Sequence, residues 1–162
     1  MTIENYIPAE QLKPFIKTYK IIQSEEDELV NRVLPDTSLA VAFRYRGQIN
    51  YILDDGKEVL PSSAISGLQK SVRLINYFKN SATIIVLFRE AGAAAFFKEP
   101  LHELFGESVP LDNFIKQQKI AIIEEQIAEA KNDRHRIAIV EQALLSQLCN
   151  SKTILQLPTV HR

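Results

Sequence analysis

A change in the spacing of apolar residues along this 162-residue chain constrains its fold more than any other feature. Between positions 39 and 53, larger apolar side chains recur at every second residue: Leu39, Val41, Phe43 and Tyr45, then Ile49, Tyr51 and Leu53. Successive side chains of a β-strand point to opposite faces, so this period of two predicts two strands. From residue 113 onward the apolar spacing becomes three and four, which is typical of helices. The sequence therefore predicts strands first and helices afterwards.

Turn residues between the strand patterns predict an antiparallel meander. Arg46-Gly47 separates the two alternating segments, and Asp54-Asp55-Gly56 ends the second with a strong hairpin signal. The segment 84–88 does not alternate, which indicates a strand buried on both faces. Further strands are predicted at residues 15–22, 29–34, 64–68, 72–78 and 83–88, and short helical turns at 8–12, near 91–97 and at 101–105.

The final third of the chain predicts a helical pair. Each helix has an apolar stripe, made of Ile120, Ile123, Ile127 and Ala130 in the first and of Ile137, Val140, Leu144 and Leu148 in the second. Asn132 and Asp133 can end the first helix and cap the second.

This order of elements predicts the α+β class, with an antiparallel β-barrel or sandwich followed by two helices. We expect the barrel at residues 1–112 and the helical hairpin at 113–148. Residues 149–162 have no convincing hydrophobic period, and we expect a linker there.

Charge and cysteine content exclude several functions. The chain has 19 Lys and Arg against 20 Asp and Glu, a net charge of −1, and no dense basic cluster, so we expect no direct nucleic-acid binding. Cys149 is the single cysteine, which rules out an internal disulfide and fits a reducing cytoplasmic setting. The amino terminus does not have a signal-peptide pattern, and no segment approaches the roughly 20 apolar residues of a membrane span. We therefore expect a cytoplasmic protein with no membrane partner.

The sequence contains no pattern typical of a catalytic or cofactor site. There is no Gly-x-Ser-x-Gly nucleophile pattern, and the five glycines stand too far apart for a phosphate-binding loop. His102, His135 and His161 all fall outside the predicted strands, where the ligands of a barrel metal site would lie. We therefore predict no catalytic residue, no metal and no cofactor, and no enzymatic activity.

A few polar residues lie within or next to apolar segments and have two possible roles. Tyr45, Tyr51 and Tyr77 can line a cavity and orient a ligand with their hydroxyls, or they can pack in the core with the hydroxyl at the surface. Glu90 follows a buried-looking strand and is either a partly buried acid, a surface residue or the ion-pair partner of Arg89 or Arg73.

Several short motifs in order resemble the amino-terminal domain of one branch of AraC-type transcription regulators. The similarity extends from about Ile7 to Leu148. Two positions depart from the family pattern: Lys20 stands where members often have an aromatic residue, and Glu90-Ala91 where they often have Pro-Gly. The motifs are Pro8, Leu12, Pro14 and Tyr19, then Leu34-Pro35-Asp36, Gly67-Leu68-Gln69, Phe88 with Gly92-Ala93, Pro100 with Glu103-Leu104, and Val109-Pro110-Leu111.

The resemblance implies a cupin-like barrel followed by helices, which passes a ligand or dimerisation signal to a carboxy-terminal helix-turn-helix domain. Residues 149–162 would then lead toward that DNA-binding domain, which is missing here, so any DNA contact would be made through it. The expected partners are a small-molecule effector and a second copy of the chain. Candidate ligand-binding residues are Phe43, Tyr51 and Tyr77, and candidate dimerisation residues are Ile120, Ile123 and Ile127.

Three alternatives stay open at this stage. The stripe of Ile120, Ile123 and Ile127 can pack on its own barrel instead of on a twin. The barrel can be filled by its own side chains, which would make the chain a structural protein-interaction domain. A small cupin-like metalloenzyme is the third alternative, and the absence of strand histidines disfavours it.

Overall fold

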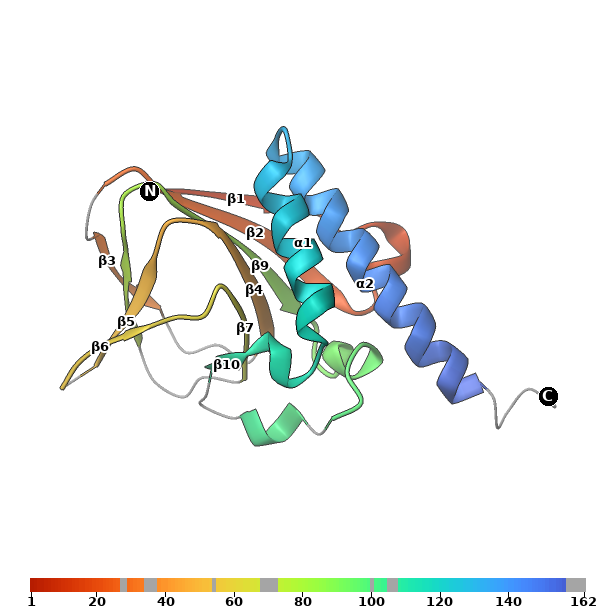
Figure 1. The fold of residues 1–162 in the computed structure, drawn as a ribbon. Helices are drawn as coiled ribbons and strands as arrows, with labels where there is room; N and C mark the ends of the chain where they lie inside the picture. Colours follow the sequence, from red (N-terminus) through yellow and green to blue (C-terminus); the bar gives the residue numbers. More distant parts are fainter. Residues whose placement is uncertain are drawn as a thin grey trace.

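The computed structural model describes residues 1–26, 29–33, 38–53, 55–67, 73–99, 101–104 and 108–156. Its strands precede its two long helices, as the order of the hydrophobic repeats predicts (Figure 1). The strands are β1 (Thr2–Tyr6), β2 (Ile16–Ser24), β3 (Leu29–Val33), β4 (Ala40–Arg46), β5 (Ile49–Leu53), β6 (Gly56–Val59), β7 (Ser63–Ser66), β8 (Arg73–Tyr77), β9 (Ser81–Phe88) and β10 (Ser108–Pro110).

The strands form two antiparallel sheets. The larger has the order β1-β2-β9-β4-β7-β10, and the smaller has the order β3-β8-β5-β6. In the larger sheet β4 lies between β9 and β7, with Ala42 opposite both Ile85 and Ala64. In the smaller sheet β5 pairs with β6 across the turn that the Asp-Gly signal predicts, with Leu53 opposite Gly56. Residues of both sheets line one cavity, so the sheets face each other as in a sandwich.

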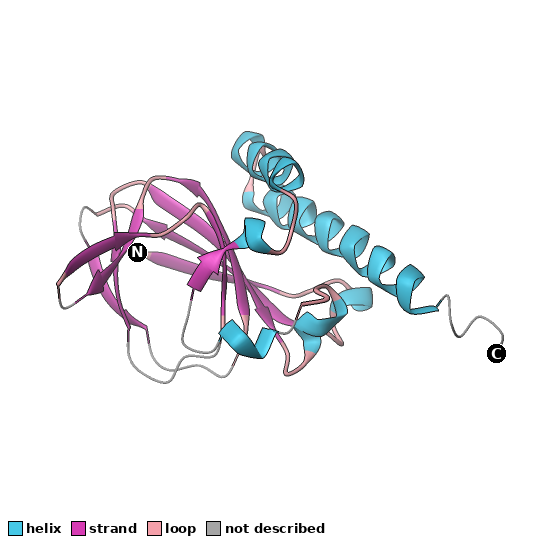
Figure 2. Cartoon of the chain, turned by 60° about the horizontal axis from the view of Figure 1, so that its bottom comes forward, coloured by secondary structure: helices cyan, strands magenta, loops and turns pink. Residues whose placement is uncertain are grey.

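Helices α1 (Gln117–Glu129) and α2 (Asp133–Gln156) form the predicted hairpin. They lie against the outer face of the larger sheet, away from the smaller one (Figures 1 and 2). Asn132 caps α2, because its side-chain oxygen accepts the backbone N–H of His135 at 2.8 Å. Short 3₁₀ turns are η1 (Glu10–Leu12), η2 (Gly92–Ala95), η3 (Leu101–Leu104) and η4 (Leu111–Asn113). No helix in the described part of the chain is long and apolar enough to cross a membrane.

The main hydrophobic core lies between the larger sheet and the helices. Phe88 packs on Phe96 and Phe97 of the segment after β9, with ring centroids 5.6 and 6.4 Å apart. The stripe of α1 and that of α2 pack into the same core. A second, smaller cluster of Ile22, Ile49 and Tyr77 lies between the two sheets. Most of the apolar surface is therefore buried outside the sandwich, under the helices.

The α+β class and the order of antiparallel sheets before a helical pair are confirmed. The sequence patterns missed three strands, β1, β6 and β10, because these edge strands are short or exposed and have little apolar alternation. Helix α2 continues to Gln156, beyond residue 148 where the predicted hairpin ends, and the linker expected at 149–162 stays a prediction. Residues 157–162 lie outside the described residues, as does the predicted turn at Pro35-Asp36.

Candidate functional site

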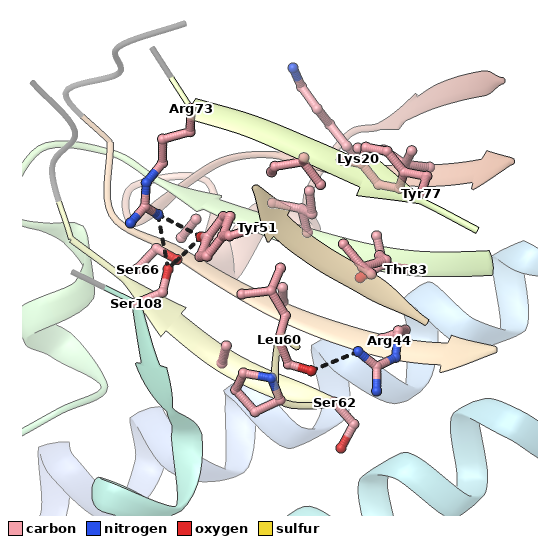
Figure 3. A pocket seen from close by; sticks show the side chains of 18 of the residues that line it. Lys20, Arg44, Tyr51, Leu60, Ser62, Ser66, Arg73, Tyr77, Thr83 and Ser108 are labelled. Carbon is pink, nitrogen blue, oxygen red and sulfur yellow. Dashed lines mark hydrogen bonds between the residues drawn. The ribbon is translucent and has the colours of Figure 1, made fainter. Parts of the chain in front are cut away.

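The candidate site is a cavity of about 260 Å³ between the two sheets (Figure 3). Its volume lies just below the range of about 300–1,000 Å³ that is usual for ligand pockets, which suits a small organic molecule. Its apolar and small lining residues are Ile22, Ala40, Ala42, Ile49, Leu60, Pro61, Ala64, Gly67, Ile75, Ile85 and Leu87. Its polar lining residues are Lys20, Ser38, Arg44, Tyr51, Ser62, Ser66, Arg73, Tyr77, Thr83 and Ser108.

The alternating side chains of β4 explain why the space between the two sheets is not filled. Val41 and Phe43 point to the helix-covered core, so Ala40, Ala42 and Arg44 point into the sandwich. Ala64 of the neighbouring β7 adds another small side chain to the same wall. Methyl groups on adjacent strands leave space that larger side chains would occupy. The cavity therefore exists because the central strands carry small side chains on the face that points into the sandwich.

A hydrogen-bonded polar cluster forms one end of the cavity. The guanidinium of Arg73 lies over the ring of Tyr51, 4.1 Å from its centroid, and donates to the Tyr51 hydroxyl and to Ser108 Oγ. The Tyr51 hydroxyl and Ser108 Oγ are 2.7 Å apart, and Ser108 also bonds to Ser66. These four side chains come from β5, β7, β8 and β10 and meet at one place (Figure 3). The cluster thus joins the smaller sheet to an edge strand of the larger one.

Arg44 and the segment 60–63 form another end of the cavity (Figure 3). Arg44 Nη1 donates to the carbonyl oxygen of Leu60 at 2.8 Å. The hydroxyls of Ser62 and Ser63 both donate to Glu124 Oε2 of α1, each at 2.6 Å. Burial lowers the pKa of Arg44, and the carboxylate of Glu124 opposes this change. A helix outside the sandwich is therefore bonded directly to the cavity wall.

Lys20 and Tyr77 contribute further polar groups. Lys20 lies on the cavity face of β2. Tyr77 on β8 is buried, and this burial, together with the nearby Tyr51, raises the pKa of its hydroxyl to about 12. The Tyr77 side chain is therefore neutral at physiological pH.

Of the three predicted ligand-binding residues, Tyr51 and Tyr77 line the cavity. Phe43 does not: it is 5% exposed and packs in the core beneath the helices. The prediction correctly gave Val41 and Phe43 a common face, but that face is the one covered by helices. Tyr45 also lies toward the helices, 4.5 Å from its ring centroid to the guanidinium of Arg136. The signal that could have located the cavity is the opposite face of the same strand, where two alanines precede Arg44.

Ile120, Ile123 and Ile127, predicted as dimerisation residues, are buried in the core of their own chain. They pack α1 on the larger sheet, which is the alternative that the sequence left open, and they leave almost no exposed surface for a second copy. The exposed side of the hairpin has other apolar residues. Ile122 is 57% exposed and lies in a surface groove between α1 and α2 with Ile139 and Ala143.

The other residues considered from the sequence lie outside the cavity or outside the described part. Glu90 is exposed in the turn after β9. His135 is exposed in the first turn of α2, and His161 lies outside the described residues. In the described part of the chain, no group of three or more His, Cys, Asp or Glu side chains is arranged to hold a metal ion.

Comparisons with known proteins give one family match and several similar solved structures. No curated protein matches the chain. One similar structure is the Cupin_2 domain of an XRE family transcriptional regulator from Enterobacter cloacae, with 11% identity, 54% of this chain and 94% of that chain covered, and a TM-score of 0.39. Another is the EutQ protein of Clostridium difficile, with 13% identity, 58% and 66% coverage and a TM-score of 0.38. A family model described as a domain of unknown function, DUF6597, matches residues 4–110, more than half of the chain, and the chain therefore belongs to the DUF6597 family.

Proposed function

We propose that this chain is a ligand-binding regulatory domain that senses a small molecule in the cavity between its sheets. The observation that carries the proposal is that parts of the cavity wall also hold helix α1. Ser62 lines the cavity and donates to Glu124 of α1. A ligand that moves Ser62 therefore changes a contact of the helix. A sensor needs such a link, because the ligand must favour one arrangement of the helix over another.

A second connection runs through β10. Ser108 belongs to the polar cluster at one end of the cavity and begins this short strand. β10 is followed directly by η4, whose Leu111 is fully buried in the core shared with α1. A ligand that replaces the bond between Tyr51 and Ser108 would change the position of β10 and, through Leu111, the packing beneath the helix.

We assign the domain to a transcription regulator of the AraC type. The support is the order of the resembling motifs and the physical role of their glycines. A side chain at Gly67 would overlap the backbone carbonyl of Leu104, and one at Gly92 would overlap that of Phe15. Both positions therefore need glycine for close packing of the segments that the motifs mark. DNA contact would be made by a separate domain, because the net charge of this chain is −1.

The test uses two small neutral probes, p-cresol and indole, in a ¹H–¹⁵N NMR titration of the full chain. Both are expected to bind at millimolar concentration and to shift amide signals of β4, β7 and β10. Shifts are also expected near Glu124 in α1, because Glu124 is bonded to the cavity wall. Ala42→Leu fills the cavity and should abolish these shifts.

Ala128→Leu is the matched control, because Ala128 is exposed on α1. This variant should respond to the probes as the unmodified chain does. Absence of binding, or binding that Ala42→Leu leaves unchanged, would contradict the cavity as the ligand site. Shifts confined to the strands, with none in α1, would contradict sensing.

Homodimerisation is a second candidate function, favoured by the exposed apolar groove of the helical hairpin. Ile122 is more than half exposed there, beside Ile139. Exposed apolar patches with polar rims are typical of protein interfaces. Sedimentation equilibrium should show a dimer that Ile122→Lys dissociates, and a monomer at high micromolar concentration would contradict this function.

A further inference from the structure

Cationic side chains are prominent in the lining of the proposed sensor's cavity. Lys20, Arg44 and Arg73 line it, whereas no Asp or Glu is among its lining residues within the part of the chain described. Charged side chains in partly buried positions are usually paired. Arg44 has no ion pair among the described residues, so we ask which negative group of a ligand it is placed to meet.

Arg44 has several N–H donors that remain for hydrogen bonds to a ligand. A guanidinium has five N–H donors, and the bond from Nη1 to Leu60 uses one of them. The ion pairs found among the described residues, Lys13–Glu10 and Arg136–Asp133, do not include Arg44. The nearby Glu124 directs its Oε2 to Ser62 and Ser63 instead. Arg44 thus presents donors to a cavity in which it has lost part of its hydration, as the lowered pKa also indicates.

The rest of the cavity determines what else the ligand must contain. Arg73 is already engaged with Tyr51 and Ser108, so its end of the cavity presents hydroxyl groups in a fixed network. Figure 3 shows Arg44 and Arg73 at opposite ends of the cavity. Between them the wall is aliphatic, with Ile49, Leu60 and Ile75 among its residues. A bare inorganic anion would leave this apolar wall without a partner.

We infer that the cavity binds a small monocarboxylate with an apolar body, whose carboxylate accepts hydrogen bonds from Arg44. Planar guanidinium and carboxylate groups match in a paired geometry, and such charge-assisted bonds are stronger than neutral ones. The apolar body lies along the aliphatic wall, and its far end meets the hydroxyls of Tyr51 and Ser108. This inference rests on the proposed function, since it names the ligand class of the same cavity.

The experiment compares acids with their neutral amides on the full chain by isothermal titration calorimetry. The probe pairs are hexanoate with hexanamide and phenylacetate with phenylacetamide. Acetate is a further probe, which has the carboxylate but almost no apolar body. Each acid should bind about tenfold or more tightly than its amide, as expected for a charge-assisted hydrogen bond. Acetate should bind at least about tenfold more weakly than hexanoate, because burial of each CH₂ adds to the affinity.

Arg44→Met should reduce hexanoate affinity to that of hexanamide and leave hexanamide binding unchanged. Arg134→Met is the matched control, because Arg134 is exposed on α2 and remote from the cavity lining. Arg44→Lys, which keeps the charge and loses the fork of donors, should show an intermediate loss. The comparison of acid with amide on the unmodified chain tests the inference even if Arg44→Met does not fold.

Three outcomes would overturn the inference. Equal binding of acids and amides would mean that the cavity binds small molecules but does not recognise the carboxylate. Equal binding of acetate and hexanoate would mean that charge alone is recognised. Failure of p-cresol, the acids and the amides to bind at all would overturn both the inference and the proposed function.

Discussion

At the scale of single residues, Ala91 has an unfavourable backbone conformation. Ala91 has φ 62° and ψ 0°, in the left-handed region that residues with a Cβ rarely adopt. It precedes η2, where Gly92 is buried against the backbone of Phe15. Glycine adopts this conformation without steric cost, and the Pro-Gly pair of the regulators that the sequence resembles has glycine at this position. The alanine therefore carries a local strain of about 1–2 kcal/mol.

Ala91→Gly should raise the free energy of unfolding by about 0.5–1 kcal/mol, because relief of strain exceeds the extra backbone entropy of glycine. Chemical denaturation measured by circular dichroism checks this value. The matched control is Ala94→Gly in η2, an exposed alanine that does not have a positive φ, which should lower stability by a similar amount. A decrease in both variants would contradict the strain at Ala91.

At the scale of elements, α1 is held near its middle and at its C-terminal end by polar side chains, as well as by its apolar stripe. Glu124 bonds it to Ser62 and Ser63 beside the cavity. At the C-terminal end Arg136 of α2 donates to the carbonyl oxygens of Ile127 and Ala130, at 3.1 and 3.2 Å. These carbonyls belong to the last turn of α1 and its C-cap, whose acceptors have no partner within the helix. The same guanidinium covers the ring of Tyr45 on the larger sheet.

Arg136→Met should lower the free energy of unfolding by about 1–3 kcal/mol, since it removes two charge-assisted hydrogen bonds to part-buried carbonyls and the contact with Tyr45. Thermal and chemical denaturation measure this loss. Arg134→Met, the control on the exposed side of α2, should change stability by less than about 0.5 kcal/mol. Equal effects of the two substitutions would show that the contacts of Arg136 do not stabilise the packing of the helical hairpin.

At the scale of the whole molecule, the main hydrophobic core and the cavity lie on different faces of the same sheet. The face toward α1 and α2 carries the large core, with Tyr19, Ile65 and Phe88 fully buried. The face toward the smaller sheet carries a small cluster and the cavity. The interior can therefore remain incompletely filled, because the apolar surface that stabilises the fold is buried elsewhere.

Substitutions on the two faces should accordingly have different effects. Phe43→Ala should lower the free energy of unfolding by about 3–5 kcal/mol, the usual loss for a buried phenylalanine, and leave the affinity of the folded protein for p-cresol unchanged. Tyr51→Phe should cost about 1 kcal/mol or less in stability and change p-cresol affinity, because it removes a cavity hydroxyl. Denaturation and NMR titration measure the two quantities. A loss of affinity in folded Phe43→Ala would contradict the separation of the faces.

The class of fold and most of its elements could be predicted from the sequence alone. The period of two over β4 and β5 and the spacing of three and four over α1 and α2 are local patterns, and they correctly indicated strands and helices. The break at Asn132 and Asp133 was likewise predicted from capping preferences. Exposed edge strands such as β1 were missed, since little apolar alternation marks them.

What only the tertiary structure decided is which face of each strand meets which neighbour. Periodicity places Val41 and Phe43 together on one face, but it does not say whether that face looks into the sandwich or toward a helix about eighty residues away in the chain. The same limit applies to the stripe of Ile120, Ile123 and Ile127, which packs on its own sheet. The cluster of Arg73, Tyr51 and Ser108 joins three strands that are distant in sequence. Such sites are made by contacts between remote segments, and a local pattern contains no information on those contacts.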